Sequence, residues 1–224
     1  MAESLSRHTD YGSVPLDEGQ VASDPLVQFR EWLEAAESEG IYEPNAMVVA
    51  TIDPDGNPSS RTVLLKGLDD TGFEFVTNYD SRKGLALLSN PRITLLFPWY
   101  SLQRQVIVYG TAARVTAAAS DAYFDSRPHA SRLAALASDQ SRPVDSRSTL
   151  EQRMRDLEAA YPEGSTIPRP SGWGAFRVTP ARIEFWQGRS SRLHDRLLFT
   201  REPAAAGSGM GSRTASWTLT RLQP

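Results

Sequence analysis

Cationic side chains gather in one short stretch near the C-terminal end of the chain. The segment EFWQGRSSRLHDR, Glu184 to Arg196, begins like a buried strand and then places three arginines and one of the three histidines within eight residues. Charges of one sign beside apolar residues are costly to bury unless an opposite charge meets them. The segment is therefore a candidate ligand site, in which only Arg189 is interpreted as an ordinary surface charge.

The segment RTVLLK, Arg61 to Lys66, carries two more cations. Strand alternation leaves one cation on each face of this apolar run, Arg61 on one face and Lys66 on the other. The simpler interpretation is a pair of solvated strand ends. Of the 24 lysines and arginines, only Lys66 and Lys83 are lysines, so these positions are candidates for a compact ammonium rather than a planar guanidinium, although chance would also explain them.

The segment DSRKG favours a phosphate site. Asp80 or Ser81 is the expected N-cap of a short helix, which places Arg82 and Lys83 in the first helical turn. The helix macrodipole disfavours cations there, whereas the free N–H groups attract anions. Arg82 and Lys83 are therefore predicted to bind a phosphate.

The segment YFDSRPHAS has a similar arrangement. Tyr123 and Arg127 are four residues apart, so they are expected on one helix face, with Pro128 ending that helix and Ser131 capping the next. A phenol, a guanidinium and a helix N-terminus would then converge on a second anion. The alternative is a packed tyrosine, a surface arginine and an ordinary cap.

Neutral groups that could read the edge of a ring occur at Gln105 and in DQS, Asp139 to Ser141. The chain has no cysteine and only three scattered histidines, so no metal site and no thiolate chemistry are expected. No GxGxxG or Walker-type loop follows an expected strand. Two anion sites without a metal or nucleophile suit a phosphorylated cofactor together with a phosphorylated substrate.

Composition limits the partners and the location. The 224 residues carry a net charge of −3, and the arginines are interspersed with carboxylates, so no nucleic-acid partner is expected. No apolar run approaches 18 residues and the N-terminal segment lacks the pattern of a signal peptide. We expect a cytoplasmic protein without a membrane partner.

The elements that must position these residues are mostly strands joined by hairpin-type turns. We expect a flexible N-terminal arm over residues 1–22 and a single domain over 23–224, with a loop at 203–212. Helices are predicted at 23–40, 80–90, 120–128, 131–141 and 148–161, and strands at 46–53, 59–68, 73–78, 92–100, 103–116, 175–179, 181–188, 196–202 and 214–222. This order predicts a mainly β (α+β) fold, an antiparallel β-barrel with peripheral helices, rather than a doubly wound parallel sheet.

Taken together, these segments resemble one known family. The motifs RTVLLK, SRKG, RQV.V.G, YF.SRP..S, QS, EFWQGR..RLHDR and the terminal RLQP follow, in order and spacing, those of the pyridoxamine 5′-phosphate oxidases, from about Asp24 to Pro224. The resemblance implies an FMN-binding split β-barrel that forms a homodimer with flavin at the subunit interface. It also implies oxidation of pyridoxamine or pyridoxine 5′-phosphate to pyridoxal 5′-phosphate, with O2 reduced to hydrogen peroxide.

The resemblance also assigns roles by motif. Arg192 and His194 would lie over the substrate ring as the catalytic pair. Substrate contacts would come from Lys66, Tyr123, Arg127, Ser131, Arg192, Leu193, His194, His8 and Tyr11. Cofactor contacts would come from Arg61, Thr62, Val63, Leu64, Leu65, Lys66, Val76, Thr77, Arg82, Lys83, Gln105, Gln140, Ser141, Trp186 and Arg196.

The chain departs from the family pattern in its arm, where His8 stands three residues before Tyr11 in place of the usual arginine. Two other functions remain open at this level. A reductase of the same fold would use another flavin or a deazaflavin, and a non-catalytic protein would only store flavin or pyridoxal phosphate.

Overall fold

The computed structural model describes Leu5, residues 10–202 and residues 216–224. His8 and the predicted loop at 203–212 lie outside the described residues. In the described part, the helices are α1 (Pro25–Ser38), α2 (Arg82–Ser89), α3 (Ala117–Asp125), α4 (His129–Ala137) and α5 (Arg147–Ala160). The strands are β1 (Ala46–Ile52), β2 (Pro58–Leu64), β3 (Gly67–Asp69), β4 (Gly72–Asn78), β5 (Arg92–Trp99), β6 (Arg104–Arg114), β7 (Trp173–Gln187), β8 (Asp195–Arg201) and β9 (Trp217–Leu222).

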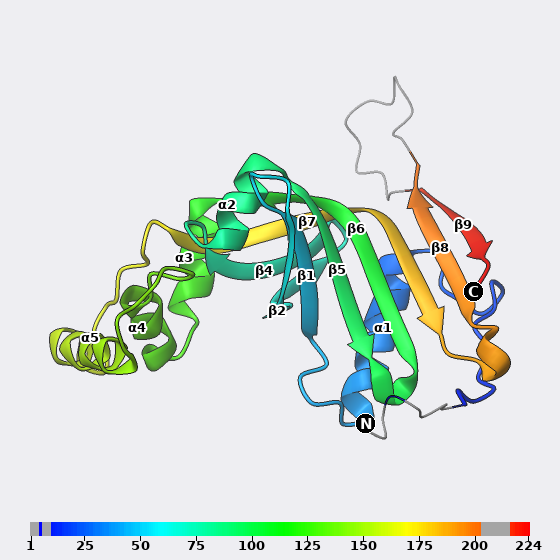
Figure 1. Ribbon diagram of the computed structural model, residues 1–224, viewed down its shortest axis with the longest axis horizontal. Coiled ribbons are helices and arrows are strands. Elements are labelled where there is room, and N and C mark those ends of the chain that lie inside the picture. Colours follow the sequence, from blue (N-terminus) through cyan, green and yellow to red (C-terminus); the bar gives the residue numbers. More distant parts are fainter. Residues whose placement is uncertain (1–4, 6–9, 203–215) are drawn as a thin grey trace.

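The nine strands form one antiparallel sheet that curls into a half-barrel (Figure 1). Its order is β2-β1-β5-β6-β7-β4-β3, with β8 added beside β7 and β9 beside β8. The chain passes directly from β2 at one edge to β3 at the other, and the Lys66 N–H donates to the Glu74 carbonyl at 2.8 Å. The predicted run 59–68 is thus two strands, because the chain leaves one edge of the sheet and joins the other at this point.

One long strand, β7, replaces the two strands predicted at 175–179 and 181–188. Its first half pairs with β4 and its second half with β8, while β6 pairs along nearly its whole length. Pro180 lies opposite Gly110, and the register with β6 shifts between Tyr109 and Gly110. A bulge accommodates a proline that cannot donate to the ladder, so the strand bends there without ending.

An aromatic cluster fills the half-barrel, and α1 supplies one side of it. Phe29 is fully buried, with its ring centroid 5.0 Å from that of Phe73 and 4.7 Å from that of Phe97. The predicted helix signals are confirmed, since Asp24 is the N-cap and Pro25 the first helical residue. Burying such rings contributes about 1.5–3 kcal/mol each to the free energy of unfolding.

Helices α3 to α5 form a second, smaller core beside β4 and β7. Phe124, Leu133, Ile167 and Trp173 are its buried members. Figure 1 shows these helices at one end of the long axis, with β8 and β9 at the other end. None of the described helices is long and apolar enough to cross a membrane.

Candidate active site

A buried ammonium lies where β4, α2 and the segment after α4 meet. Lys83 Nζ donates to Thr77 Oγ1 at 2.9 Å and to Gln140 Oε1 at 2.8 Å, and its side chain faces no carboxylate among the described residues. The predicted cofactor residues Thr77, Lys83 and Gln140 are therefore in contact. Burial, and to a smaller extent the charge of Arg61, lower the pKa of Lys83 to about 8.

Arg61 adds a second cation that is held only by neutral oxygens. Its guanidinium donates to Val49 O at 3.2 Å, Thr51 Oγ1 at 2.8 Å and Ser59 Oγ at 2.7 Å. Burial lowers the pKa of this guanidinium, the nearby charge of Asp53 opposes that shift, and the charge of Arg82 adds to it. Asp53 reaches Arg61 only through Ser59 Oγ, and neither Arg61 nor Lys83 forms an ion pair with a carboxylate among the described residues, which leaves a place for a bound anion.

Arg82 has a carboxylate of its own. Its Nη2 lies 2.5 Å from Asp53 Oδ2, and Asp53 is a buried residue that also accepts from Ser59 Oγ at 2.9 Å. The hydrogen bond from Arg82 lowers the pKa of Asp53. Ser81 is the N-cap of α2, as predicted, and Arg82 and Lys83 occupy the first turn. The charge of Arg82 is thus already balanced, whereas that of Lys83 is not.

Tyr123 and Arg127 meet at a tryptophan that the sequence did not single out. The Tyr123 ring stacks on Trp173 with centroids 6.2 Å apart, and the Arg127 guanidinium lies 4.7 Å from the Trp173 ring centroid. Arg127 Nη1 is buried without a hydrogen-bond partner among the described residues. Burial lowers the pKa of Arg127 and raises that of Tyr123.

The helix geometry behind this second cluster differs from the prediction. α3 ends at Asp125, so Arg127 is in the connection and not on its face, and the N-cap of α4 is Pro128 rather than Ser131. Ser131 instead lies in the first turn of α4, because the extended ψ of Pro128 already starts the helix. Three of the four buried polar atoms without a partner in the described residues lie here, on Arg127, His129 and Arg132.

A third group of predicted residues forms a row across β6, β7 and β8. Gln105 pairs with Trp186, and Trp186 pairs with Arg196, so these three side chains project from one face of the sheet. Arg196 Nε donates to Oε1 of Glu184 at 2.7 Å, and Glu184 is buried. That hydrogen bond raises the pKa of Arg196 and fixes its direction.

His194 lies against this row and follows a tight turn. Residues Ser190–Arg192 form a 3₁₀ turn, and Ser191 and Arg192 have positive φ of 57° and 62°. The ring centroid of His194 is 4.7 Å from that of Trp186, and Nδ1 accepts from the Arg189 N–H at 3.1 Å. This leaves Nε2 of His194 for a ligand.

Arg189, predicted to be an ordinary surface charge, instead forms specific contacts. Besides the backbone contact with His194, its Nη1 donates to Asp195 Oδ2 at 3.0 Å. The sequence could not reveal this, because the pairing depends on the turn that brings residue 189 back over residue 195.

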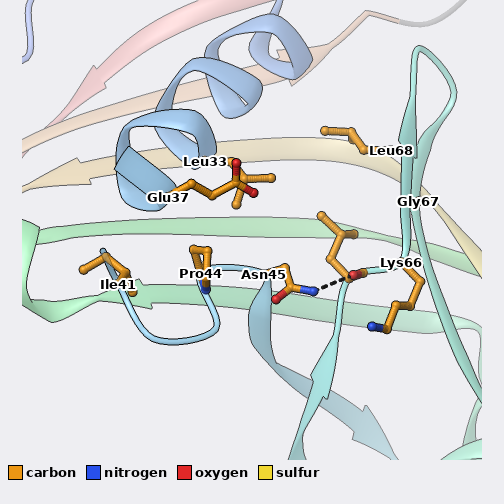
Figure 2. Close-up of a pocket in the computed structure, with 9 residues that line it drawn as sticks. Leu33, Glu37, Ile41, Pro44, Asn45, Lys66, Gly67 and Leu68 are labelled. Atoms are coloured by element: carbon orange, nitrogen blue, oxygen red, sulfur yellow. Dashed lines mark hydrogen bonds between the residues drawn. The ribbon is translucent and has the colours of Figure 1, made fainter. Parts of the chain in front are cut away.

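Lys66, the first residue after β2 and Leu65, is exposed. It lines a groove of about 620 Å³ between α1 and the β2–β3 connection, together with Glu37 and Asn45 (Figure 2). Its ammonium has no hydrogen-bond partner among the described residues, and Asn45 Nδ2 donates to the Leu65 carbonyl beside it at 3.0 Å. The substrate role predicted for Lys66 stays a prediction.

The remaining predicted residues fall beside these groups. Thr62, Val63 and Leu64 continue β2 from Arg61, Leu65 follows them, Val76 precedes Thr77 in β4, and Ser141, with a φ of 71°, follows Gln140. Arg192 and Leu193 are exposed in the turn before β8.

The site residues thus divide between the two ends of β7. We name the two ends after the groups that their residues are predicted to bind. The phosphate end comprises Arg61, Thr77, Lys83, Tyr123, Arg127, Gln140 and Trp173, and the ring end comprises Tyr11, Gln105, Trp186, His194 and Arg196. Thr77 pairs with Gly174 at the start of β7, whereas Trp186 is next to its last residue. At about 3.3 Å per residue, about 40 Å of strand separates Trp173 from Trp186.

This architecture is that of the pyridoxamine 5′-phosphate oxidase-like split barrels. The family model "Pyridoxamine 5'-phosphate oxidase" matches residues 33–187, and the model "Pyridoxine 5'-phosphate oxidase C-terminal dimerisation region" matches 173–224. The chain belongs to the pyridoxine/pyridoxamine 5′-phosphate oxidase family, which confirms the resemblance and the predicted fold class.

Individual relatives agree with this assignment. The chain is 53% identical to the pyridoxine/pyridoxamine 5′-phosphate oxidase of Rubrobacter xylanophilus, over 96% of this chain and 94% of the relative. It is 46% identical to that of Salinibacter ruber over the full length of both. Among solved structures, PhzG from Burkholderia lata 383 is similar with a TM-score of 0.83 and 30% identity, covering 95% of this chain and 99% of PhzG.

Proposed function

We propose that the protein is an FMN-dependent oxidase that converts pyridoxamine 5′-phosphate and pyridoxine 5′-phosphate to pyridoxal 5′-phosphate, with reduction of O2 to hydrogen peroxide. The observation that supports it best is that the phosphate end contains two clusters of cationic side chains that form no ion pair with a carboxylate among the described residues. Lys83 with Arg61 suits one phosphate, and Arg127 with Tyr123 suits another. A phosphorylated flavin and a phosphorylated substrate account for both.

The residues fit FMN. Lys83 and Arg61 form charge-assisted contacts only with neutral oxygens, so a phosphate dianion can replace or join those contacts without displacing a carboxylate. Arg82 completes the group through its pair with Asp53, which keeps α2 in place. At the ring end, Gln105, Trp186 and Arg196 lie in one row that suits a planar ring system.

The chain's residues orient the substrate for hydride transfer. Arg127, Tyr123 and the first turn of α4 with Ser131 bind the substrate phosphate, and this remote binding energy aligns the reacting carbon. His194, with Nδ1 occupied by the Arg189 N–H, presents Nε2 to the ring substituents, and Arg192 lies beside it in the turn. FMN, when bound, supplies the hydride acceptor.

The separation of roughly 40 Å between the two ends of β7 supports a homodimeric site. A flavin and its substrate are far shorter than this strand, which favours a site whose two ends come from different subunits. A two-fold axis that sets the phosphate end of one subunit against the ring end of the other forms two complete sites. The dimerisation region matched at residues 173–224 contains β7, β8 and β9.

Purification followed by a peroxide assay tests the proposal. We expect a yellow protein that consumes O2 and releases hydrogen peroxide with pyridoxamine 5′-phosphate. A yellow protein that binds both vitamers without O2 consumption and instead oxidises a reduced nicotinamide would indicate a reductase. A protein that binds FMN or pyridoxal phosphate but has no turnover would indicate a storage function.

Mixed dimers test the shared site. Homodimers of Lys83→Met and of Trp186→Ala should each lose most activity, because every site lacks one end. When the two variant chains are unfolded together and refolded, half of the chains should enter mixed dimers, in which one site holds both substitutions and the other holds neither. The measurement is recovery of about one quarter of the wild-type activity, and no recovery above the two homodimers would contradict the proposed arrangement.

A further inference from the structure

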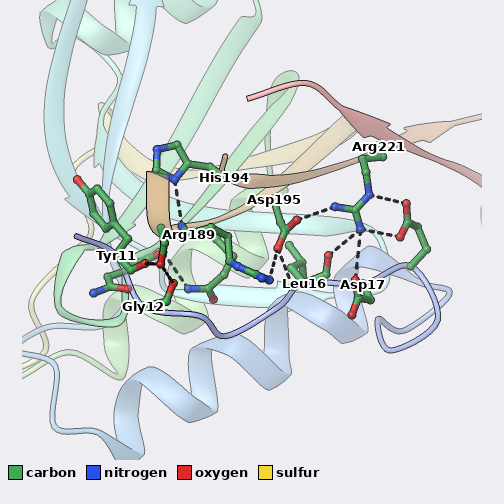
Figure 3. Close-up of polar contacts among 12 residues, drawn as sticks. Tyr11, Gly12, Leu16, Asp17, Arg189, His194, Asp195 and Arg221 are labelled. Carbon is green, nitrogen blue, oxygen red and sulfur yellow. Dashed lines mark hydrogen bonds and ion pairs between the residues drawn. The ribbon is translucent and has the colours of Figure 1, made fainter. Parts of the chain in front are cut away.

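A network of ion pairs fastens the described part of the N-terminal arm to β8 and β9 (Figure 3). The Arg221 guanidinium donates two hydrogen bonds to the Glu18 carboxylate, from Nε to Oε1 at 2.8 Å and from Nη2 to Oε2 at 2.6 Å. Nη2 also donates to the Leu16 carbonyl at 3.0 Å. This bidentate geometry fixes both the side chain and the backbone of the arm, which an isolated surface ion pair would not do.

Asp195 completes the network from the strand side. Its Oδ1 accepts from Arg221 Nη1 at 2.7 Å, and its Oδ2 accepts from the Leu16 N–H at 3.1 Å and from Arg189 Nη1 at 3.0 Å. The Asp195 side chain is only 16% exposed, so water and salt screen these contacts incompletely. Asp195 immediately follows His194, and the network therefore joins the arm to the ring end.

The arm places Tyr11 on the ring end. The Tyr11 ring lies edge-on to Trp186, with centroids 5.9 Å apart, and to His194, with centroids 5.3 Å apart. Ser190 Oγ lies 3.3 Å from the carbonyl oxygens of both Tyr11 and Gly12. A Cβ at Gly188 would lie 2.8 Å from Cδ1 of Tyr11, so glycine leaves the space that this ring fills.

We propose that Arg221 and Asp195 are positioning residues that latch residues 16–18 and thereby hold Tyr11 over His194 when substrate binds. The inference rests on the proposed function, because the ring end is taken there as the place of the substrate ring. With the latch open, residues 10–18 are released from β8 and β9, and the substrate-competent form has the latch closed. The apparent Kd for substrate is then the intrinsic Kd divided by the fraction of molecules whose latch is closed.

The test uses Arg221→Gln, which keeps a polar side chain but loses the charge. We expect the KM for pyridoxamine 5′-phosphate to rise about tenfold, with kcat, FMN content and the dimeric state unchanged. Cleavage after Glu18 by a glutamyl endopeptidase should also accelerate, a readout that needs no activity. Arg147→Gln is the matched control, since it breaks an exposed Arg147–Glu151 pair on α5 far from the arm.

Gly188→Ala displaces Tyr11 while leaving the ion pairs intact. It should raise KM like Arg221→Gln but leave the cleavage rate after Glu18 at the wild-type value. An Arg221→Gln protein with unchanged KM and unchanged cleavage would overturn the latch, and so would one whose KM rises only because it becomes monomeric. A wild-type protein without oxidase activity would instead contradict the proposed function, while the cleavage comparison would still test the latch.

Discussion

Replacing Lys83 with methionine is expected to remove most of the FMN from the purified protein, with a rise in the Kd for FMN of about 100-fold. The ammonium is buried, and it donates to Thr77 and Gln140 at the place proposed for the flavin phosphate. Removing one partner of a buried charged pair typically costs about 2–5 kcal/mol of binding free energy, and about 2.7 kcal/mol corresponds to 100-fold. The measurements are the flavin-to-protein ratio and a titration of apoprotein followed by flavin fluorescence.

The pH dependence of FMN binding gives the same prediction a second readout. Burial lowers the pKa of Lys83 from 10.5 to about 8 in the apoprotein, so the ammonium loses its proton as pH rises through 8. The FMN phosphate stays a dianion above pH 7 because its second pKa is near 6. We expect wild-type affinity for FMN to fall between pH 7 and pH 9.5, and the affinity of Lys83→Met to change much less.

The apoprotein should respond in the opposite direction. Between pH 8 and pH 10.5 the unfolded chain holds more protons on Lys83 than the folded chain does, so this residue's contribution to the free energy of unfolding rises with pH. Lys83→Met should therefore fold at least as stably as wild type at pH 7. Arg155→Met, at an exposed position on α5, is the control for removal of a cation. A Lys83→Met protein that folds and keeps its full flavin content at every pH would refute the assignment.

Replacing Arg127 with methionine is expected to raise the KM for pyridoxamine 5′-phosphate about 100-fold while sparing the unphosphorylated substrate. The guanidinium lies on the Trp173 ring with Nη1 buried and unpartnered in the described residues, so its positive charge is available to a phosphate. Removing a charge-assisted hydrogen bond from a buried site costs about 2–3 kcal/mol of binding free energy. Steady-state kinetics with pyridoxamine and with its 5′-phosphate provide the comparison.

The ratio of the two specificity constants decides the outcome for Arg127. Wild type should prefer the phosphorylated substrate strongly, and Arg127→Met should lose most of that preference. Because the substitution removes a desolvated charge, the thermal midpoint should not fall. Arg142→Met, at an exposed position further along the chain, should behave as wild type. An equal loss for both substrates would mean that Arg127 supports the fold or the flavin instead.

The sequence predicted which residues belong to the Lys83, Arg127 and Trp186 clusters better than it predicted how these clusters are arranged in space. Local signals sufficed for Ser81 as a cap, for Lys83 in the first turn of α2 and for the strand that carries Trp186. Ser131 was misplaced as a cap because proline at residue 128 can take the extended conformation that starts a helix. The two candidate N-caps, Pro128 and Ser131, are about one helical turn apart, and the choice between them depends on what the helix packs against.

Partners distant in sequence could not be predicted. Trp173 was not recognised as the surface under Tyr123 and Arg127, and Glu184 was not recognised as the partner of Arg196. Asp53 and Arg82 are 29 residues apart and meet only because the β1–β2 hairpin reaches α2. The Glu184–Arg196 pair depends on sheet register and the others on how helices pack against the sheet, and neither is specified by local sequence signals.

The length of β7 has a consequence for how the enzyme responds to dilution. One continuous strand carries Trp173 and Trp186 near its two ends, and its ladder with β6 holds the two ends apart within a chain. Under the proposed arrangement, catalysis belongs to the pair of subunits and stops wherever the pair dissociates. Specific activity then reports the association equilibrium. It is constant at high protein concentration and falls towards zero below the dissociation constant of the dimer.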